Sequence, residues 1–330
     1  MNSEKNSAAI SNLTRRAARG LAKVRLTHVA LGAAFLLAAA VTVHPPKAWA
    51  QPPNPNGMHV YIWSGLKTHG AGQHDYPQFL ADWSKVLTEK GAIVDGALHA
   101  PSAADLEHTD VVVLYKGDVT LNMSDAEKAV IEAYVKRGGG LVSLHDSLCG
   151  PDPAWIANVM FGGGKKHGET NFTLDAPIPL TVVDKASPLM KDFNDITLPD
   201  DESFYLMTWA KDPIHVLATT KTADTPSARL GTNHVGEVVP QIWTYEHTLP
   251  GGQPARAFVY MEGHTYANFD NPQIKNLLLR GIAWAGNKPV ETLASYVPPP
   301  GGRGGRGGSG RGGRGFSGRG GGGGAPAAAQ

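Results

Sequence analysis

Three histidines stand at or shortly after the ends of apolar, strand-like runs of the sequence. They are His69, His145 and His264, which follow the runs 58–63, 141–144 and 257–261. Imidazole is the side chain best suited to proton transfer near neutral pH and to binding metals. In an open α/β sheet, ligands bind at the carboxyl ends of the strands, because the loops there surround a crevice. The pattern therefore predicts that the chemistry lies on one rim of a sheet.

Further polar and aromatic residues are candidates for the same rim. Glu202 lies in an acidic run and can serve as a general base or a metal ligand. Candidates for substrate binding are His74, Asp146, His167 and Trp243. Each has a structural alternative: solvated loops for the loop histidines, a satisfied core position for His145, a hydrated turn for Glu202 and core packing for Trp243.

The elements between these residues alternate between strand and helix. Strand-like runs are expected at 59–63, 92–98, 111–116, 141–144, 214–220, 240–245 and 256–262, and helices at 76–90, 124–137 and 271–285. The clearest helix starts at the capping box Ser124-Asp125-Ala126-Glu127 and stops at Gly138. Short strand–helix–strand connections imply right-handed crossovers. We therefore predict a flavodoxin-like α/β sandwich, mainly parallel, with some antiparallel strands near the C-terminal end.

The two ends of the chain differ from the middle. Residues 1–50 combine a basic leader, an apolar run and the small-x-small site Ala48-Trp49-Ala50, which is typical of a signal peptide. We expect an exported protein, periplasmic or extracellular, with the twin-arginine pathway as an alternative to the general one. A linker follows at 51–57, then one α/β domain at 58–290. The tail 291–330 is rich in proline and then in glycine and arginine, and we expect it to be disordered.

Charge and cysteine usage exclude several classes of protein. The chain carries net +1, but the basic leader and the five tail arginines leave residues 51–300 at net −10. We therefore expect no nucleic acid partner for the domain, whereas the tail could contact an anionic envelope polymer. Cys149 is the only cysteine, so no internal disulfide and no thiolate metal cluster can form. A homo-oligomer remains an alternative to a monomer.

Several motifs in order resemble the trehalose-utilisation (ThuA-like) family over about residues 58–287. The motifs are Tyr61-Ile62-Trp63-Ser64-Gly65, Gly138-Gly139-Gly140-Leu141 through His145, Phe161-Gly162-Gly163, Asp201-Glu202-Ser203-Phe204-Tyr205, and Gly263-His264 before 277–285. The resemblance implies a class I glutamine-amidotransferase-like three-layer sandwich. It also implies a role in sugar catabolism, often beside dehydrogenases that make 3-keto-glycosides.

One departure from that superfamily concerns its cysteine. Amidotransferases carry it on a sharp strand-to-helix turn, where this chain has His145-Asp146-Ser147, and Cys149 is not in such an elbow. We therefore predict that the protein is not a glutaminase. A serine elbow of the Gly-x-Ser-x-Gly type and a His-Glu-x-x-His helix are also missing from the sequence.

The resemblance and the candidate residues together give a mechanistic hypothesis. A keto-sugar has an acidic hydrogen beside its carbonyl, which a histidine or Glu202 can remove. We predict His69, His145, Glu202 and His264 as catalytic residues, and the same four as candidate ligands of one divalent metal ion. Isomerisation, epimerisation, elimination or metal-assisted hydrolysis of a carbohydrate substrate would then follow. The alternative is a non-catalytic carbohydrate-binding or envelope-interaction protein.

Overall fold

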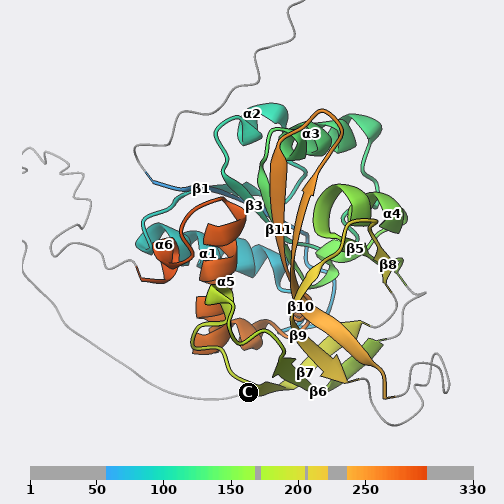
Figure 1. Cartoon of the computed structure of the whole chain (residues 1–330), viewed down its shortest axis with the longest axis vertical. Helices are drawn as coiled ribbons and strands as arrows, with labels where there is room; N and C mark the ends of the chain where they lie inside the picture. The colour runs from blue at the N-terminus through green and yellow to red at the C-terminus, as the bar shows by residue number, and fades with distance from the viewer. Residues whose placement is uncertain (1–56, 168–171, 205–206, 222–235, 296–330) are drawn as a thin grey trace, which may run out of the picture. The chain divides into compact units, whose positions relative to one another are not determined.

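A mixed sheet with helices on both faces forms the body of the protein in the computed structural model (Figure 1). The structure describes residues 57–167, 172–204, 207–221 and 236–295. The predicted signal peptide, nearly all of the linker and the tail from 296 lie outside the described residues. Within the described part of the chain, no helix is long and apolar enough to cross a membrane.

The strands are β1 (His59–Ser64), β2 (Ile93–Ala97), β3 (Val111–Tyr115), β4 (Gly140–Leu144), β5 (Gly163–Gly164), β6 (Phe172–Val182), β7 (Ile196–Phe204), β8 (Thr208–Trp209), β9 (His215–Lys221), β10 (Val238–Thr248) and β11 (Pro254–Tyr260). The α-helices are α1 (Tyr76–Glu89), α2 (Ala103–Leu106), α3 (Asp125–Lys136), α4 (Pro153–Trp155), α5 (Pro272–Ala285) and α6 (Glu291–Ala294). Short 3-10 or π turns are η1 (His145–Leu148), η2 (Ile156–Phe161), η3 (Pro188–Met190) and η4 (Tyr266–Asp270).

The sheet joins a parallel half to an antiparallel half. Its strand order is β2-β1-β3-β4-β11-β10-β9-β6-β7. The first five strands pair in parallel, and from β11 onward each neighbour is antiparallel. Reading β11 as the fifth parallel strand gives the order 2-1-3-4-5 of flavodoxin-like folds. The predicted fold class, including the antiparallel strands late in the chain, is confirmed.

The inner parallel strands β1, β3 and β4 are buried on both faces, which explains their largely apolar runs. All five residues of β3 are buried, and they alternate between two cores. Val113 packs with the helices α1 and α5 on one face, whereas Val112 and Leu114 pack with α3 and η2 on the other. Figure 1 shows α1 and α5 on the opposite side of the sheet from α3 and α4.

Two parts of the fold differ from the sequence-based expectation. The strands β6 and β7 were not predicted, and β7 includes the acidic run that we considered a hydrated turn. The domain also extends beyond 290, because α6 packs back on α5 through the buried Leu293 and an ion pair between Arg280 and Glu291 of 3.0 Å. We therefore correct the start of the tail, which we had placed at 291.

Candidate metal and substrate site

The strand register places the candidate residues on one rim. Ser64 pairs with Tyr115, and Tyr115 and Tyr260 both pair with Leu144, so β1, β3, β4 and β11 end at the same level of the sheet. The loops that leave these ends carry His74, His145 and His264. Glu202 approaches from β7 in the antiparallel half.

His145 projects from a sharp turn between β4 and η1. Its backbone φ is +52°, a left-handed conformation that is uncommon for a residue with a side chain. Strain of this kind persists where the surrounding structure holds it, and it is concentrated at functional sites. The turn directly follows β4 at the carboxyl end of the strand. Here it lifts a fully buried imidazole into the rim.

The loop after β1 is fixed to the loop after β11. The backbone N–H of His74 donates to the carbonyl of His264 at 3.0 Å. The backbone N–H of Tyr266 donates to the carbonyl of Gly72 at 2.8 Å. His74 also has a left-handed backbone, with φ of +46°. These contacts turn the His74 side chain inward, where it is 2 % exposed.

Asp201 connects the segments that carry Glu202 and His264. Its Oδ1 accepts backbone N–H bonds from Glu202 at 2.8 Å, from Gly263 at 3.0 Å and from His264 at 2.9 Å. Its Oδ2 accepts a further bond from the Asn268 side chain at 2.6 Å. The carboxylate is fully buried. It accepts the hydrogen bonds of backbone N–H groups that have no partner strand at this position. Asp201 thereby sets the distance between β7 and the loop after β11.

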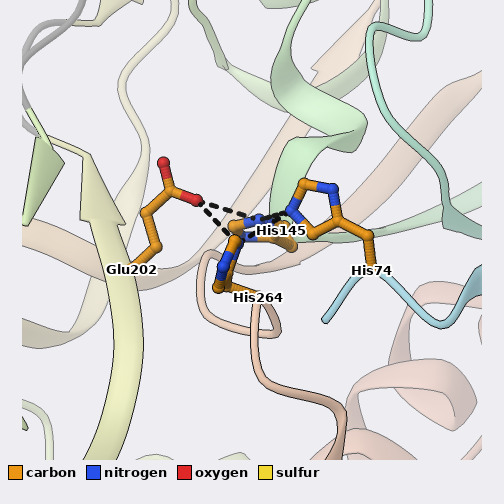
Figure 2. A group of neighbouring side chains, drawn as sticks. All are labelled: His74, His145, Glu202 and His264. Carbon is orange, nitrogen blue, oxygen red and sulfur yellow. Dashed lines mark hydrogen bonds and ion pairs between the residues drawn. The ribbon is translucent and has the colours of Figure 1, made fainter. Parts of the chain in front are cut away.

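Four buried donor atoms converge at the centre of the rim (Figure 2). The Nε2 atom of His74 lies 2.9 Å from Nε2 of His145 and 2.9 Å from Nδ1 of His264. The Oε2 atom of Glu202 lies 3.3 Å from the same His145 atom and 3.1 Å from the same His264 atom. All four atoms lie within 4.8 Å of one another.

The outer hydrogen bonds orient these rings as metal ligands. The Nδ1 atom of His145 donates to the carbonyl of Met261 at 3.2 Å, which leaves Nε2 with its lone pair toward the centre. The Nδ1 atom of His74 is bonded to Thr68 Oγ1 at 3.0 Å. One proton at the centre can form a hydrogen bond in only some of the close contacts between the ring nitrogens. A metal cation can accept a lone pair from all four donor atoms at once. Ligands at about 2.1 Å from a tetrahedral ion are about 3.4 Å apart, close to the separations seen here.

Electrostatics favour a cation at this position. Burial would raise the pKa of Glu202, but hydrogen bonds from His145 and His264 lower it to about 2, so this carboxylate is ionised. Burial, together with the neighbouring His145, lowers the pKa of His74 to about 2, so this ring is neutral. Burial would also lower the pKa of His145, but the carboxylates of Asp146 and Glu202 raise it above its ordinary value. A metal ion would therefore compete with a proton for Nε2 of His145.

A buried ion pair lies against this cluster. Lys165 Nζ is 2.8 Å from Asp146 Oδ1 and lies over the ring of Phe204. The other oxygen of Asp146 is 3.9 Å from Nε2 of both His74 and His145. Burial opposes ionisation of both partners, but the lysine lowers the pKa of Asp146 and the carboxylate raises the pKa of Lys165. Both groups are therefore charged.

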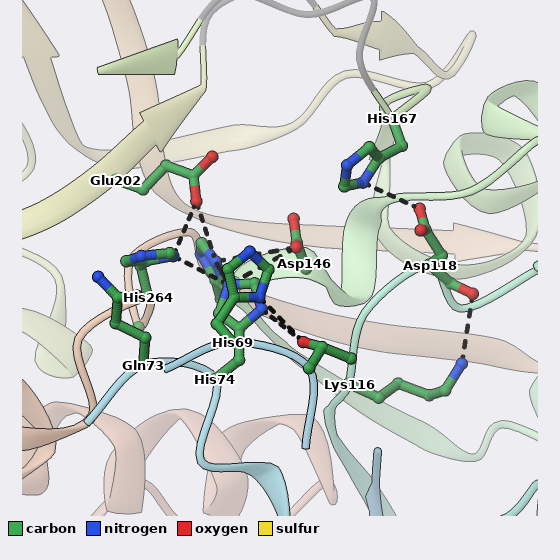
Figure 3. Close-up of polar contacts among 12 residues, drawn as sticks. His69, Gln73, His74, Lys116, Asp118, Asp146, His167, Glu202 and His264 are labelled. Atoms are coloured by element: carbon green, nitrogen blue, oxygen red, sulfur yellow. Dashed lines mark hydrogen bonds and ion pairs between the residues drawn. The ribbon is translucent and has the colours of Figure 1, made fainter. Parts of the chain in front are cut away.

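The predicted site residues have different positions (Figure 3). We had predicted His69 as a metal ligand, but His74 from the same loop supplies this donor atom. His69 is exposed and stands beside the cluster, with its ring 3.9 Å from that of His74. His167 is exposed and contacts Asp118 at 3.4 Å. Trp243 is fully buried and donates to the carbonyl of Phe161 at 2.9 Å, so it packs in the core and cannot stack on a sugar.

The sequence analysis missed three residues that build the site. Thr68 and Lys165 lie in glycine-containing loops that resemble ordinary surface, and Asp201 was passed over in favour of its neighbour Glu202. The position of Asp201 directly before the candidate ligand Glu202 was the one signal in the sequence that could have indicated its role. For the other two, only the folded arrangement reveals the role.

Competition between a metal ion and a proton for His145 leads to a prediction about pH. We expect binding of a divalent cation to release about one proton, so the affinity should rise about tenfold per pH unit below the raised pKa of His145 and level off above it. Isothermal titration calorimetry with Mn²⁺ or Zn²⁺, in buffers of different ionisation enthalpy, measures the released proton. An affinity that stays constant from acidic to neutral pH would contradict this assignment.

Asp201 gives a second prediction. Because outer partners of ligands typically contribute 10–100-fold to metal affinity, we expect Asp201→Asn to weaken cation binding by about that factor. The control is Asp270→Asn, which removes an exposed carboxylate from η4. Calorimetry gives the affinities, and circular dichroism verifies the fold of each variant. Equal affinities of the two folded variants would show that Asp201 does not hold the ligands in place.

Comparisons with known proteins agree with the predicted family and fold. A protein described as ThuA-like from Parabacteroides merdae is 19 % identical, with 74 % of this chain and 94 % of that chain covered and a TM-score of 0.54. A second ThuA-like protein, from Bacteroides uniformis, is 17 % identical, with 71 % and 93 % covered and a TM-score of 0.50. No curated protein matches the sequence. The family model for ThuA, trehalose utilisation, matches residues 59–285, and the chain therefore belongs to the ThuA family.

Proposed function

We propose that this protein is an enzyme of carbohydrate catabolism that acts on a keto-sugar or a glycoside through a bound divalent cation. The observation that carries the proposal is the convergence of His74, His145, Glu202 and His264, which come from four separate segments and are all buried. Keeping three imidazoles and a carboxylate out of water is costly unless they bind something together. The description of the family as one of trehalose utilisation supports a sugar substrate.

The donor set fits ions that prefer mixed nitrogen and oxygen ligands. When bound, such an ion would stabilise negative charge on the carbonyl oxygen of the substrate. The carboxylate of Glu202 is held ionised by its histidine partners, so it suits a ligand better than a base. The pair of Asp146 and Lys165 holds a fixed charge beside the cluster and is positioned to orient a substrate hydroxyl.

His69 is the base in this proposal. Its ring stands outside the four donors, on the exposed side of the cluster. Burial and the neighbouring His264 lower its pKa, so the ring is neutral at pH 7 and can accept a proton. The sequence-based hypothesis named a histidine or Glu202 as the base, and this proposal assigns that role to His69.

The chemical step begins at the carbon beside the carbonyl. His69 takes the proton from the C–H bond, and the electron pair moves into the carbonyl to form an enediolate. Return of the proton on either face gives the epimer or the starting compound. In a 3-keto-glycoside the electron pair can instead form the C1–C2 double bond and break the C1–O bond, and the leaving oxygen takes a proton from solvent or from imidazolium.

Hydrogen exchange at that carbon tests the proposal directly. After the metal content of the purified protein has been measured, 3-keto-trehalose is incubated with it in D₂O and followed by NMR. We expect the signal of the hydrogen beside the ketone to disappear, and a chelator to stop its loss. His69→Gln should abolish exchange, whereas His215→Gln, which removes a histidine paired with Asp184, should leave it intact. Saturable binding of the sugar without exchange would instead support a carbohydrate-binding protein.

We also propose that the protein is exported. The predicted cleavage site after Ala50 supports this, with Gln51 as the first residue of the mature chain. Mass spectrometry of the protein from the native cell envelope tests it, because a mature N-terminus at Gln51 is expected there. An intact N-terminus on cytoplasmic protein would contradict export.

A further inference from the structure

A groove runs beside the histidine cluster at the carboxyl ends of β1, β2 and β3. Its volume is about 480 Å³, and its walls include Trp63, Leu66, Thr68, Leu98, Lys116 and Leu121. Ligands of open α/β sheets bind at this edge of the strands. The groove is separate from the four donor atoms, none of whose residues lines it.

Three exposed leucines line the groove. Leu66 is 68 % exposed, Leu98 38 % and Leu121 53 %. They come from three different loops, yet they account for three of the seven large apolar side chains that are exposed in the described part of the chain. Single exposed apolar residues are ordinary, whereas a patch assembled from separate loops marks a binding surface.

Two charged side chains that line the groove, Lys116 and Glu127, are bonded within the protein, whereas the buried Nε1 of Trp63 has no hydrogen-bond partner among the described residues. The Lys116 ammonium donates to the carbonyls of Asp118 and Val119 and lies 5.2 Å from the centre of the Trp63 ring. The Glu127 carboxylate accepts bonds from Ser124 at the start of α3. A second sugar ring needs several available hydrogen-bond partners. The three exposed leucines instead favour the binding of an apolar group of the ligand.

Thr68 connects the groove with the cluster. The residue lines the groove, and its Oγ1 is 3.0 Å from Nδ1 of both His69 and His74. Only the width of the His74 ring separates this hydroxyl from the donor atoms. Figure 3 shows Lys116 and Asp118 to one side of the histidines, where Asp118 contacts His167. A substrate whose reacting sugar lies at the histidines therefore has its next substituent within reach of the leucines.

We propose that the groove binds the apolar aglycone of a glycoside, so that the substrates of this enzyme are aryl or branched alkyl glycosides. The inference rests on the proposed function, because it places the sugar at the cluster. A cavity of about 150 Å³ accommodates benzene, so the groove has room for a two-ring aromatic group. Burying such a group releases water from both the leucines and the ligand.

Binding is tested by calorimetry with 2-naphthyl and methyl glucosides. We expect the naphthyl compound to bind at least about tenfold more tightly, which corresponds to about 1.4 kcal/mol. The double variant Leu66→Ser, Leu121→Ser should lose most of this difference and bind the methyl compound as before. The control is Val183→Ser, which removes an equally exposed side chain outside the groove and should change neither affinity.

Turnover of the 3-keto forms separates the two proposals. If methyl 3-keto-glucoside and 3-keto-trehalose are both inert, the proposed function fails, and the calorimetry still decides whether the groove binds apolar groups. If the methyl compound reacts but the naphthyl compound has no advantage in kcat/KM, the aglycone proposal is overturned. A preference for 3-keto-trehalose that is insensitive to the leucine substitutions overturns it as well, because the groove would then bind a second sugar.

Discussion

His74→Ala is expected to weaken divalent-cation binding by at least about 100-fold, because even the loss of an outer partner of a ligand costs 10–100-fold. The Nε2 atom of His74 contacts both neighbouring imidazoles at 2.9 Å and completes the four-donor set. Without it, an ion would keep three protein ligands and gain water in place of a buried imidazole. Calorimetry with Mn²⁺ and Zn²⁺ measures the difference.

The neighbouring histidine supplies the matched control. His69→Ala removes an imidazole from the same loop, but this ring is exposed and is not one of the four donors. We expect it to leave cation affinity within about threefold of the wild-type value, which is less than the loss of an outer partner causes. Hydrogen exchange on the substrate should nevertheless be lost. If both alanine variants lose affinity equally, the ion is not held as the structure indicates.

Asp146→Asn is expected to destabilise the protein by about 3–5 kcal/mol, because it leaves the charge of Lys165 buried without a partner. The lysine side chain is only 3 % exposed, and its ammonium is 2.8 Å from the carboxylate. For a domain of this size, the expected fall in Tm is about 2–4 °C per kcal/mol. Denaturant unfolding of the wild type and the variant gives the free energies.

A double-mutant cycle shows whether the loss comes from the unpaired charge. Lys165→Met in the Asp146→Asn background removes that charge, so the double variant should recover most of the stability. Glu89→Gln is the control, because the pair of Lys85 and Glu89 is exposed on α1 and should contribute about 0.5 kcal/mol or less. Equal losses in the single and double variants would show that packing, not charge, dominates at this position.

Local signals predicted the parallel half of the fold. The apolar run of β3 and the capping box of α3 each determine their element over a few residues, and both were found where expected. In contrast, β7 contains Pro199 and three consecutive acids, which are depleted in strands. Pairing with β6, together with the amides that bond to Asp201, stabilises this segment. These partners lie 16 to 32 positions away in β6 and 62 positions away at Gly263, so a local pattern does not reveal them.

The candidate site was partly predictable for a similar reason. Histidines at strand ends must share a rim once the sheet is parallel, so His145 and His264 could be identified. The choice between His69 and His74 could not, since they lie five residues apart in one flexible-looking loop. His74 faces the cluster because its backbone is left-handed and its N–H donates to the carbonyl of His264. Both features exist only in the folded chain.

The donors of the cluster are widely separated along the chain, with 190 positions between His74 and His264. Closing a loop of that length costs entropy before the contact can stabilise the chain, so contacts of this kind form slowly. The coordination sphere therefore does not exist in a nascent or partly folded chain, and no ion can be captured during early synthesis. For the proposed metal site, the ion supply of the compartment in which folding finishes would therefore determine which metal is bound. For a chain that crosses a membrane already folded, that compartment is the one it leaves.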